Sequence, residues 1–194
     1  MQVLKDDIRN DILKSALEEF SDNGYAKATM ISIAKRSKVS KSNLYRYFVS
    51  KEEICHELLK EPIISIQNAL KVLTGTEFLS HSNDEIACMM TDALFPILSL
   101  YRREIMIIIN ADAPRDCGEL KAYIEKKLMK NFLAFDPQRT PKGFAETLVK
   151  MLMAGIENIL MDYHSDENMK EQINSLLKYH IRGVLAFSML REEK

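Results

Sequence analysis

From Asn23 to Lys51 the chain carries seven basic side chains and no acidic one. The basic residues are Lys27, Lys35, Arg36, Lys38, Lys41, Arg46 and Lys51. Because the formal net charge of all 194 residues is only −1, this positive charge is a local concentration. Ammonium and guanidinium groups gathered in this way can bind the phosphates of a nucleic acid, but they can also form an ordinary solvated basic face. The charge by itself does not decide between these two interpretations.

The other reactive side chains do not converge on a catalytic or metal site. His56 follows Cys55, and adjacent helical residues diverge by about 100°, so the imidazole and the thiol cannot face each other. Glu157, Asp162 and His164 do not fall on one helical face, as a metal site would require. We therefore expect a protein that is not an enzyme and that holds no metal and no cofactor.

The cysteine content and the apolar pattern indicate a protein of the cytoplasm. The three cysteines are widely spaced and form no C-x-x-C pair, which argues for a reducing compartment and against a disulfide framework or a zinc site. No apolar run approaches the ~20 residues that span a bilayer, and the N-terminal residues contain no apolar signal core. We expect a cytoplasmic protein with no membrane partner.

The basic window predicts two short helices around a tight turn. Thr29 can cap a helix that runs through Ser37, and Ser40 can cap a second helix that runs through Phe48. Gly24 ends the preceding helical stretch, because glycine adopts the left-handed conformation of a helix C-terminus at little cost. This layout is typical of a helix-turn-helix, so it favours the nucleic-acid interpretation of the charge.

Apolar residues of the two helices predict which faces are buried. Ala34, Val39 and Leu44 fall where two helices that cross at a steep angle need one small residue and two apolar contacts. The second helix then exposes donor-rich side chains near its N-terminus, which is the end of a recognition helix that enters the major groove. These side chains are Lys41, Ser42, Asn43, Tyr45 and Arg46.

Two side chains of the second helix keep alternative interpretations. Asn43 has the chemistry to read an adenine edge, but it can equally be a capping partner of Ser40. Tyr47 can lie in the core or contact a phosphate, whereas the adjacent Phe48 is expected in the core.

The stretch from Thr29 to Ile54 reads T-x-x-x-I-A-x-x-x-x-V-S-x-x-x-L-Y-x-Y-F-x-x-K-E-E-I. It resembles the DNA-binding signature of the TetR family of bacterial transcriptional repressors, and the resemblance is close over residues 5–54. Lys51 matches the phosphate-binding lysine that begins the fourth helix of the family. By position, the resemblance implies DNA contacts for Thr29, Lys41, Ser42, Asn43, Tyr45, Arg46, Tyr47 and Lys51.

The chain departs from the family pattern at two places. Ser37 and Lys38 stand where members usually have Ala-Gly. If the turn needs a positive φ at Lys38, the side chain costs about 1 kcal/mol of strain. Its ammonium group can in return contact a phosphate, so we count Lys38 among the expected DNA contacts. Ile31 occupies a position that is often polar or basic, so we expect poorer base readout from the first of the two helices.

The remaining residues predict helices and no strand, so the expected fold class is all-α. No segment alternates with a period of two between turn residues, and the apolar run Ile105–Ile109 continues a helical pattern. Ser50 and Glu53 form a capping box that opens a long helix. Pro62 lies inside this helix and predicts a bend.

Further boundaries follow from turn residues. We expect Asn83 to cap a helix that Pro96 interrupts, and residues 111–118 to form a polar connection. Thr140–Pro141 predicts the start of the next helix, since proline suits the first helical position. The last helix is expected from Met169 to Leu190.

This pattern predicts two domains. Residues 1–48 form a three-helix helix-turn-helix DNA-binding domain, and residues 49–194 form a larger helical domain for ligand binding and dimerisation. The last two helices are apolar on more than one side, and the resemblance implies that they pair with their mates in a homodimer. One recognition helix reads only a few base pairs at ~1–3 kcal/mol each, so selecting one site in a genome also requires a dimer and a palindromic operator.

The resemblance implies a ligand-responsive repressor in a bacterium, which leaves double-stranded DNA when a small-molecule inducer binds the helical domain. The pocket residues are unknown, since the eleven methionines can line a pocket for apolar ligands or simply fill an irregular core. The alternative is an architectural protein that binds DNA without sequence preference and has no effector. The near-neutral net charge and the large second domain argue against that alternative.

Overall fold

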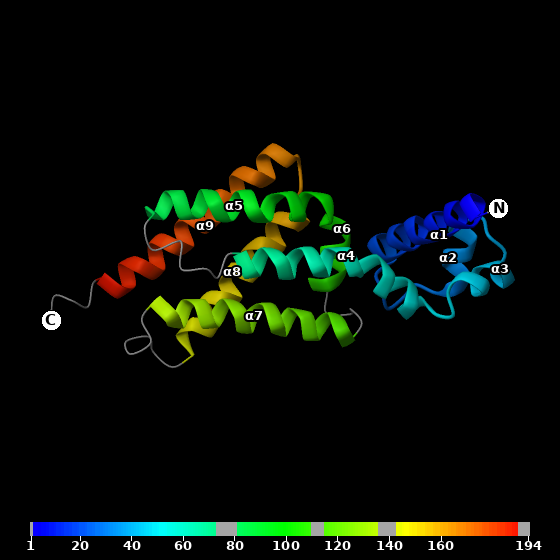
Figure 1. The fold of residues 1–194 in the computed structure, drawn as a ribbon, viewed down its shortest axis with the longest axis horizontal. Coiled ribbons are helices and arrows are strands. Elements are labelled where there is room, and N and C mark those ends of the chain that lie inside the picture. The colour runs from blue at the N-terminus through cyan, green and yellow to red at the C-terminus, as the bar shows by residue number, and fades with distance from the viewer. Residues whose placement is uncertain (1, 73–80, 110–114, 136–142, 190–194) are drawn as a thin grey trace. The chain divides into compact units, whose positions relative to one another are not determined.

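The computed structural model describes residues 2–72, 81–109, 115–135 and 143–189. Within these residues the chain forms nine α-helices and no β-strand, so the all-α prediction is confirmed (Figure 1). None of the helices in the described ranges is long and apolar enough to cross a membrane. The helices are α1 (Gln2–Asn23), α2 (Met30–Arg36), α3 (Lys41–Tyr47), α4 (Lys51–Val72), α5 (Asn83–Leu100), α6 (Arg102–Ile109), α7 (Arg115–Phe135), α8 (Phe144–Met161) and α9 (Asp166–Met189).

The residues of the chain contact one another in two compact units. The first unit comprises Met1–Ile64 and Arg103–Leu120, and the second comprises Ser65–Arg102 and Lys121–Lys194. The predicted boundary after residue 48 lies inside the first unit. The division into a DNA-binding domain and a ligand-binding domain at that residue stays a prediction.

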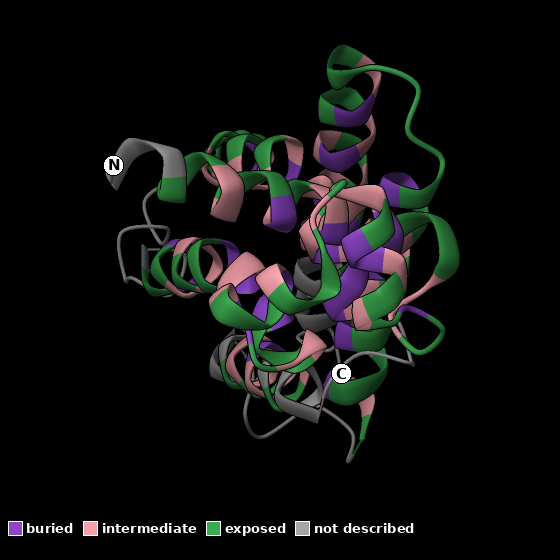
Figure 2. Cartoon of the chain, turned by 90° about the vertical axis from the view of Figure 1, so that its right-hand side faces the viewer, coloured by how far each residue is buried: buried purple, intermediate pink, exposed green. Residues whose placement is uncertain are grey.

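In the first unit, α1 buries the face that its sequence pattern predicts. Ile12, Ala16 and Phe20 are buried, and Ile8 is half-buried at the end of the same face. Buried positions recur on one side of the helices and exposed positions on the other (Figure 2). Gly24 ends the helix with a φ of +80°, which confirms its predicted role as a C-terminal stop.

Helices α2 and α3 complete the expected helix-turn-helix, in which α1 packs on α2 and α2 on α3. Thr29 and Ser40 are the N-cap residues, as predicted. Ala34 and Leu44 are buried, and Val39 in the turn is half-buried. A seven-residue helix such as α3 has little stability of its own, so its position depends on this packing.

The turn between α2 and α3 does place a non-glycine residue in the left-handed region. Lys38 has a φ of +57°, and it is the single non-glycine residue with positive φ among the described residues. The turn closes through the Val39 N–H, which donates to the Ala34 carbonyl at 3.1 Å. The strain expected from the sequence is therefore present.

In the second unit, α9 packs on both α5 and α8 (Figure 1). The approach of α8 to α9 is close at Gly155, where an added Cβ would lie 2.8 Å from Leu176 Cδ2. Polar contacts join α9 to α5. Thr91 Oγ1 donates to Asn174 Oδ1 at 3.3 Å, and Arg182 pairs with Asp84 at 2.7 Å.

The N-terminus of α5 corrects one prediction. Ser82, and not Asn83, is the N-cap, and Asn83 is the first helical residue. Ser82 Oγ accepts from the Glu85 N–H at 3.3 Å, while the Ser82 N–H donates to Glu85 Oε2 at 2.7 Å. This reciprocal pair is a capping box, which stabilises the helix more than an isolated asparagine cap.

The predicted interruption at Pro96 is also wrong. Helix α5 continues through Pro96 and ends at Leu100. Tyr101 is its C-cap, and the Tyr101 N–H donates to the Ile97 carbonyl at 3.0 Å. Proline removes one helical donor, but packing of α5 on α9 holds the helix across it. Helix α4 likewise continues through the buried Pro62, where a bend stays a prediction.

Two other helix boundaries differ from the predicted ones, and a third prediction concerns residues outside the described ranges. Helix α7 begins at Arg115, so the second half of the expected connection 111–118 is helical. Thr140–Pro141 lies outside the described residues, and the described part of α8 begins at Phe144 after Gly143, whose φ is +82°. Helix α9 begins at Asp166, before Met169, because acidic residues stabilise the positive end of a helix.

We expect Lys38→Gly to raise the free energy of unfolding by about 1 kcal/mol, because glycine adopts this φ without steric cost. The matched control is Lys35→Gly inside α2, which should lower the free energy of unfolding by about 1 kcal/mol. Urea unfolding of both variants measures the two effects. A loss of stability in Lys38→Gly equal to that of the control would contradict the strain assigned to the turn.

Candidate nucleic-acid interface

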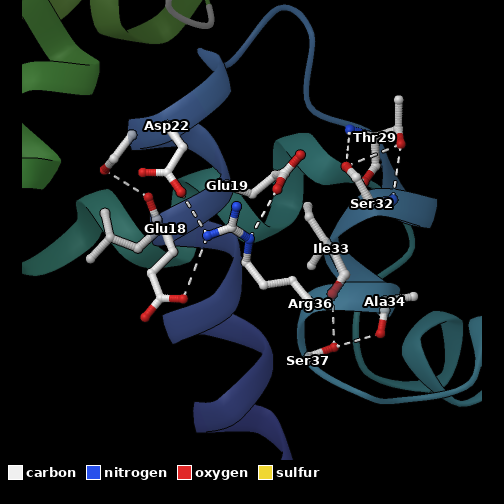
Figure 3. Close-up of polar contacts among 11 residues, drawn as sticks. Glu18, Glu19, Asp22, Thr29, Ser32, Ile33, Ala34, Arg36 and Ser37 are labelled. Carbon is white, nitrogen blue, oxygen red and sulfur yellow. Dashed lines mark hydrogen bonds and ion pairs between the residues drawn. The ribbon is translucent and has the colours of Figure 1, made fainter.

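The first helix of the pair begins in a capping box that contains no acid. The Ser32 N–H donates to Thr29 Oγ1 at 3.0 Å, and the Thr29 N–H donates to Ser32 Oγ at 3.0 Å (Figure 3). Such boxes usually carry glutamate or glutamine at the position of Ser32. Serine makes the same reciprocal contact without adding negative charge, and neither α2 nor α3 has an acidic residue in its first turn. The N-terminal ends of both helices therefore remain electropositive.

One side chain of α3 is buried, and most of the others are exposed to solvent. Leu44 is fully buried, which turns Lys41, Ser42, Tyr45 and Arg46 outward, and all four are exposed. The predicted contact residues of the second helix are thus brought together on one short surface. The adjacent Thr29 and Lys38 are also exposed.

The two alternatives for Asn43 concern different atoms. The Asn43 backbone N–H donates to Ser40 Oγ at 3.2 Å, so the capping interaction is present. The side-chain amide forms no hydrogen bond within the described residues and remains available to an outside partner. Tyr47 is half-buried and Phe48 is buried, as expected for the latter.

Arg36 is half-buried and is paired with acids of α1, so its charge is neutralised within the helix-turn-helix. Its guanidinium lies 3.0 Å from Glu19 Oε2, 2.8 Å from Asp22 Oδ2 and 3.7 Å from Glu18 Oε2 (Figure 3). The hydrogen bond to Asp22, together with the other carboxylates, raises the pKa of Arg36 above its usual value. Because Glu19 is almost fully buried, this ion pair ties α2 to α1.

Lys51, a predicted phosphate contact, is bound within the fold. Its Nζ donates to the carbonyls of Tyr25, Ala28 and Ala26 at 2.9, 3.1 and 3.3 Å, and it lies 4.4 Å from the centre of the Tyr25 ring. These three bonds use all three N–H donors of the ammonium group. Lys51 therefore holds the segment that leads directly into the Thr29 cap. A direct contact of Lys51 with phosphate stays a prediction.

Five cations of the basic window have no counter-ion within the described residues. They are all exposed: Lys27, Lys35, Lys38, Lys41 and Arg46. Two of the seven basic residues are thus bound by other groups of the fold, and the other five give the exposed surface of residues 27–46 a positive charge. A surface of this kind attracts a polyanion.

A groove beside α3 brings in residues of α1 that the sequence analysis missed. It has a volume of about 520 Å³ and is lined by Lys5, Asp6 and Arg9 from α1 and by Asn43, Arg46 and Tyr47 from α3. Arg9 pairs with Glu57 at 2.9 Å and lies over the Phe48 ring, so Lys5 and Arg46 are the groove cations without a counter-ion in the described residues. The spacing of four residues between Lys5 and Arg9, which places both on one helical face, was the available signal.

Outside this surface, the side chains that could perform chemistry remain apart. Among the described residues no group of three or more histidine, cysteine or acidic side chains could hold a metal ion. Cys55 is buried while the adjacent His56 is exposed. His180 is buried in α9, and burial lowers its pKa.

Residues 12–58 match the family model of bacterial regulatory proteins of the tetR family. The helix-turn-helix segment of this chain is therefore of the TetR-family type. The match covers the helix-turn-helix and the start of α4, which are the segments where the sequence resembles the family. That resemblance is therefore confirmed.

One curated relative of this chain is the HTH-type transcriptional regulator UidR of Escherichia coli (strain K12). The two are 26% identical over 130 residues, which are 66% of this chain and 63% of UidR. The chain thus matches less than two thirds of the length of this relative.

Solved structures of TetR-family proteins share the fold. A TetR-family transcriptional regulator from Bordetella parapertussis 12822 superposes with a TM-score of 0.68 at 19% identity, over 88% of this chain and 93% of that one. The TetR-family repressor FadR of Thermus thermophilus, in complex with lauroyl-CoA, superposes with a TM-score of 0.53 at 16% identity, over 90% and 94%.

We expect Lys51→Met to lower the free energy of unfolding by about 2 kcal/mol, since it removes three hydrogen bonds from a charged donor. Amide exchange at residues 25–29 should become faster, because the segment loses its anchor. The matched control is Lys60→Met, which changes an exposed lysine on the same helix. Equal behaviour of the two variants would refute the anchoring role of Lys51.

Proposed function

We propose that this TetR-family protein is a transcriptional repressor that binds a palindromic DNA operator as a homodimer. A small-molecule inducer releases it. The observation that carries the proposal is the set of five exposed cations in the helix-turn-helix, which have no counter-ion among the described residues, together with a short helix that is anchored by its one buried residue. A duplex supplies a regular array of phosphates for the cations and base edges for the side chains of α3.

The contacts of this surface divide into two kinds. Lys38, Lys41 and Arg46 are exposed donors that suit phosphate, which positions the protein without reading sequence. Asn43 suits an adenine edge, because its side-chain amide can both donate and accept. The remaining donors toward the duplex are Thr29, Ser42, Tyr45 and Tyr47. The ammonium group of Lys51 is bound to backbone carbonyls, so we propose that it attracts the duplex through its charge. We add Lys5 of α1, which lies in the groove beside Arg46.

Dimer formation follows from the limited reach of one recognition helix. A seven-residue helix reads only a few base pairs, and two copies related by a two-fold axis double the readout. Helices α8 and α9 provide the proposed interface. They keep apolar side chains exposed in the single chain, with Met151 at 53% and Tyr179 at 71%. An exposed apolar surface of this kind favours association.

The effector is proposed to bind the helical part of the chain beyond α4. The lauroyl-CoA complex of FadR, which shares the fold, supports a small molecule as effector and suggests acyl-CoAs as the first compounds to test. An inducer can release the operator only through its different affinities for the bound and released conformations. Binding to the folded state would raise the melting temperature in a thermal-shift screen.

The division of contacts is tested with two variants on DNA selected from a random duplex pool by the full chain. We expect Lys41→Ala to weaken binding to all sequences alike and to reduce the salt dependence by about one phosphate per half-site. Asn43→Ala should change the preferred base at one position per half-site by about 1–3 kcal/mol. Lys60→Ala, an exposed lysine of α4, is the control and should leave both quantities unchanged.

The same experiment distinguishes the proposed repressor from an architectural DNA-binding protein. A repressor selects a palindromic sequence from the pool, whereas an architectural protein selects none. If Lys41→Ala and Asn43→Ala change binding in the same way, the proposed placement of α3 in the major groove is wrong.

A further inference from the structure

Ile31 is a large aliphatic side chain on the outside of the positively charged helix pair. It is 62% exposed, although it lies in a helix whose Ile33 and Ala34 are buried. Lys35 follows one turn later on the same face and is also exposed. An exposed isoleucine alone needs no explanation, but this one lies next to cations that have no counter-ion in the described residues.

We infer that Ile31 reads the C5 methyl group of a thymine at the edge of the major groove, an inference that rests on the proposed function. The methyl group of thymine is the apolar feature that the major groove offers, and aliphatic or methyl-bearing side chains contact it. Isoleucine has neither donor nor acceptor, so it cannot read any other base edge. The first helix of a helix-turn-helix crosses the DNA backbone beside the groove, within reach of this edge.

The local structure holds Ile31 in one position. The Thr29–Ser32 capping box fixes the start of α2, and the Arg36 ion pairs with α1 fix its end. A β-branched side chain in a helix has one strongly preferred χ1 rotamer. Contact with a methyl group therefore costs Ile31 little conformational freedom, which a long side chain such as lysine would lose.

The contact would give α2 a part in sequence preference without a polar side chain at this place. The charged neighbours Lys35 and Lys38 hold the duplex through its phosphates, whatever its sequence. Removing water from two apolar groups then favours thymine over the other bases. The same methyl group occurs on 5-methylcytosine, so the experiment must distinguish these two sources.

The test uses the full chain and the duplex that it selects from a random pool of unmethylated DNA. Each thymine is replaced in turn by deoxyuridine, which removes the methyl group and leaves the hydrogen-bonding edge unchanged. We expect one thymine per half-site at which the replacement weakens wild-type binding about fourfold, or about fifteenfold when both half-sites are changed. Because the substitution is present in both chains of the dimer, Ile31→Ala should bind the unmodified duplex about fifteenfold more weakly and should not respond to deoxyuridine at this position.

Two controls complete the design. Leu100→Ala removes an apolar side chain that is 71% exposed on α5, and it should respond to deoxyuridine as the wild type does. A parallel selection with 5-methylcytosine in the pool identifies the source of the methyl group. Enrichment of thymine at this position in both pools supports the assignment, and enrichment of methylated cytosine in its place overturns it.

The remaining outcomes separate the inference from the proposed function. If wild type and Ile31→Ala respond identically to deoxyuridine at every position of a selected palindrome, the role of Ile31 is refuted and the repressor stands. If Ile31→Ala weakens all sequences alike, Ile31 contacts sugar or backbone and the inference is again overturned. If the pool yields no preferred sequence, the proposed function fails, and the reading of thymine fails with it.

Discussion

The surface around α3 depends on positive charge that the fold does not neutralise. Exposed cations at this density repel one another, and a folded chain usually intersperses acids among them. Here Glu18, Glu19 and Asp22 of α1 pair with Arg36, and backbone carbonyls bind Lys51. The segment from Asn23 to Lys51 contains no acid. The five remaining cations have no counter-ion in the part of the chain that the structure describes, which is the physical reason to propose a polyanion.

Packing gives this charge its geometry. Leu44 holds a helix too short to be stable alone, while the Thr29–Ser32 box and the Ser40 cap fix where α2 and α3 begin. The positive φ of Lys38 sets the turn between them. The ion pair of Arg36 with Glu19 holds α2 on α1, and the hydrogen bonds of Lys51 hold the segment that precedes Thr29. Structural and contact residues are thus interleaved along the same short segment, and a substitution in this segment must be tested for both effects.

Local patterns in the sequence predicted α2 and α3 well. Contacts between residues far apart in the sequence were not predicted. The caps at Thr29 and Ser40 and the stop at Gly24 depend on neighbours within four residues, so the sequence pattern contains them. The partners of Lys51 lie 23 to 26 residues away, and no local rule predicts them. The course of α5 through Pro96 likewise depends on its packing against α9, which overrides the helix-breaking tendency of proline. The spacing of Lys5 and Arg9 indicated that both share one helical face, but that this face of α1 lines a groove with α3 depends on contacts between distant residues.

The account is tested most directly by the salt dependence of binding to the DNA upstream of the protein's own coding sequence. If five cations of each chain in a dimer meet phosphates, the logarithm of the affinity should fall linearly with the logarithm of the salt concentration, with a slope of about −9. A footprint at low ionic strength should cover one palindromic segment. Failure to bind any fragment of this DNA at low ionic strength, or binding that does not change with salt, would contradict the account.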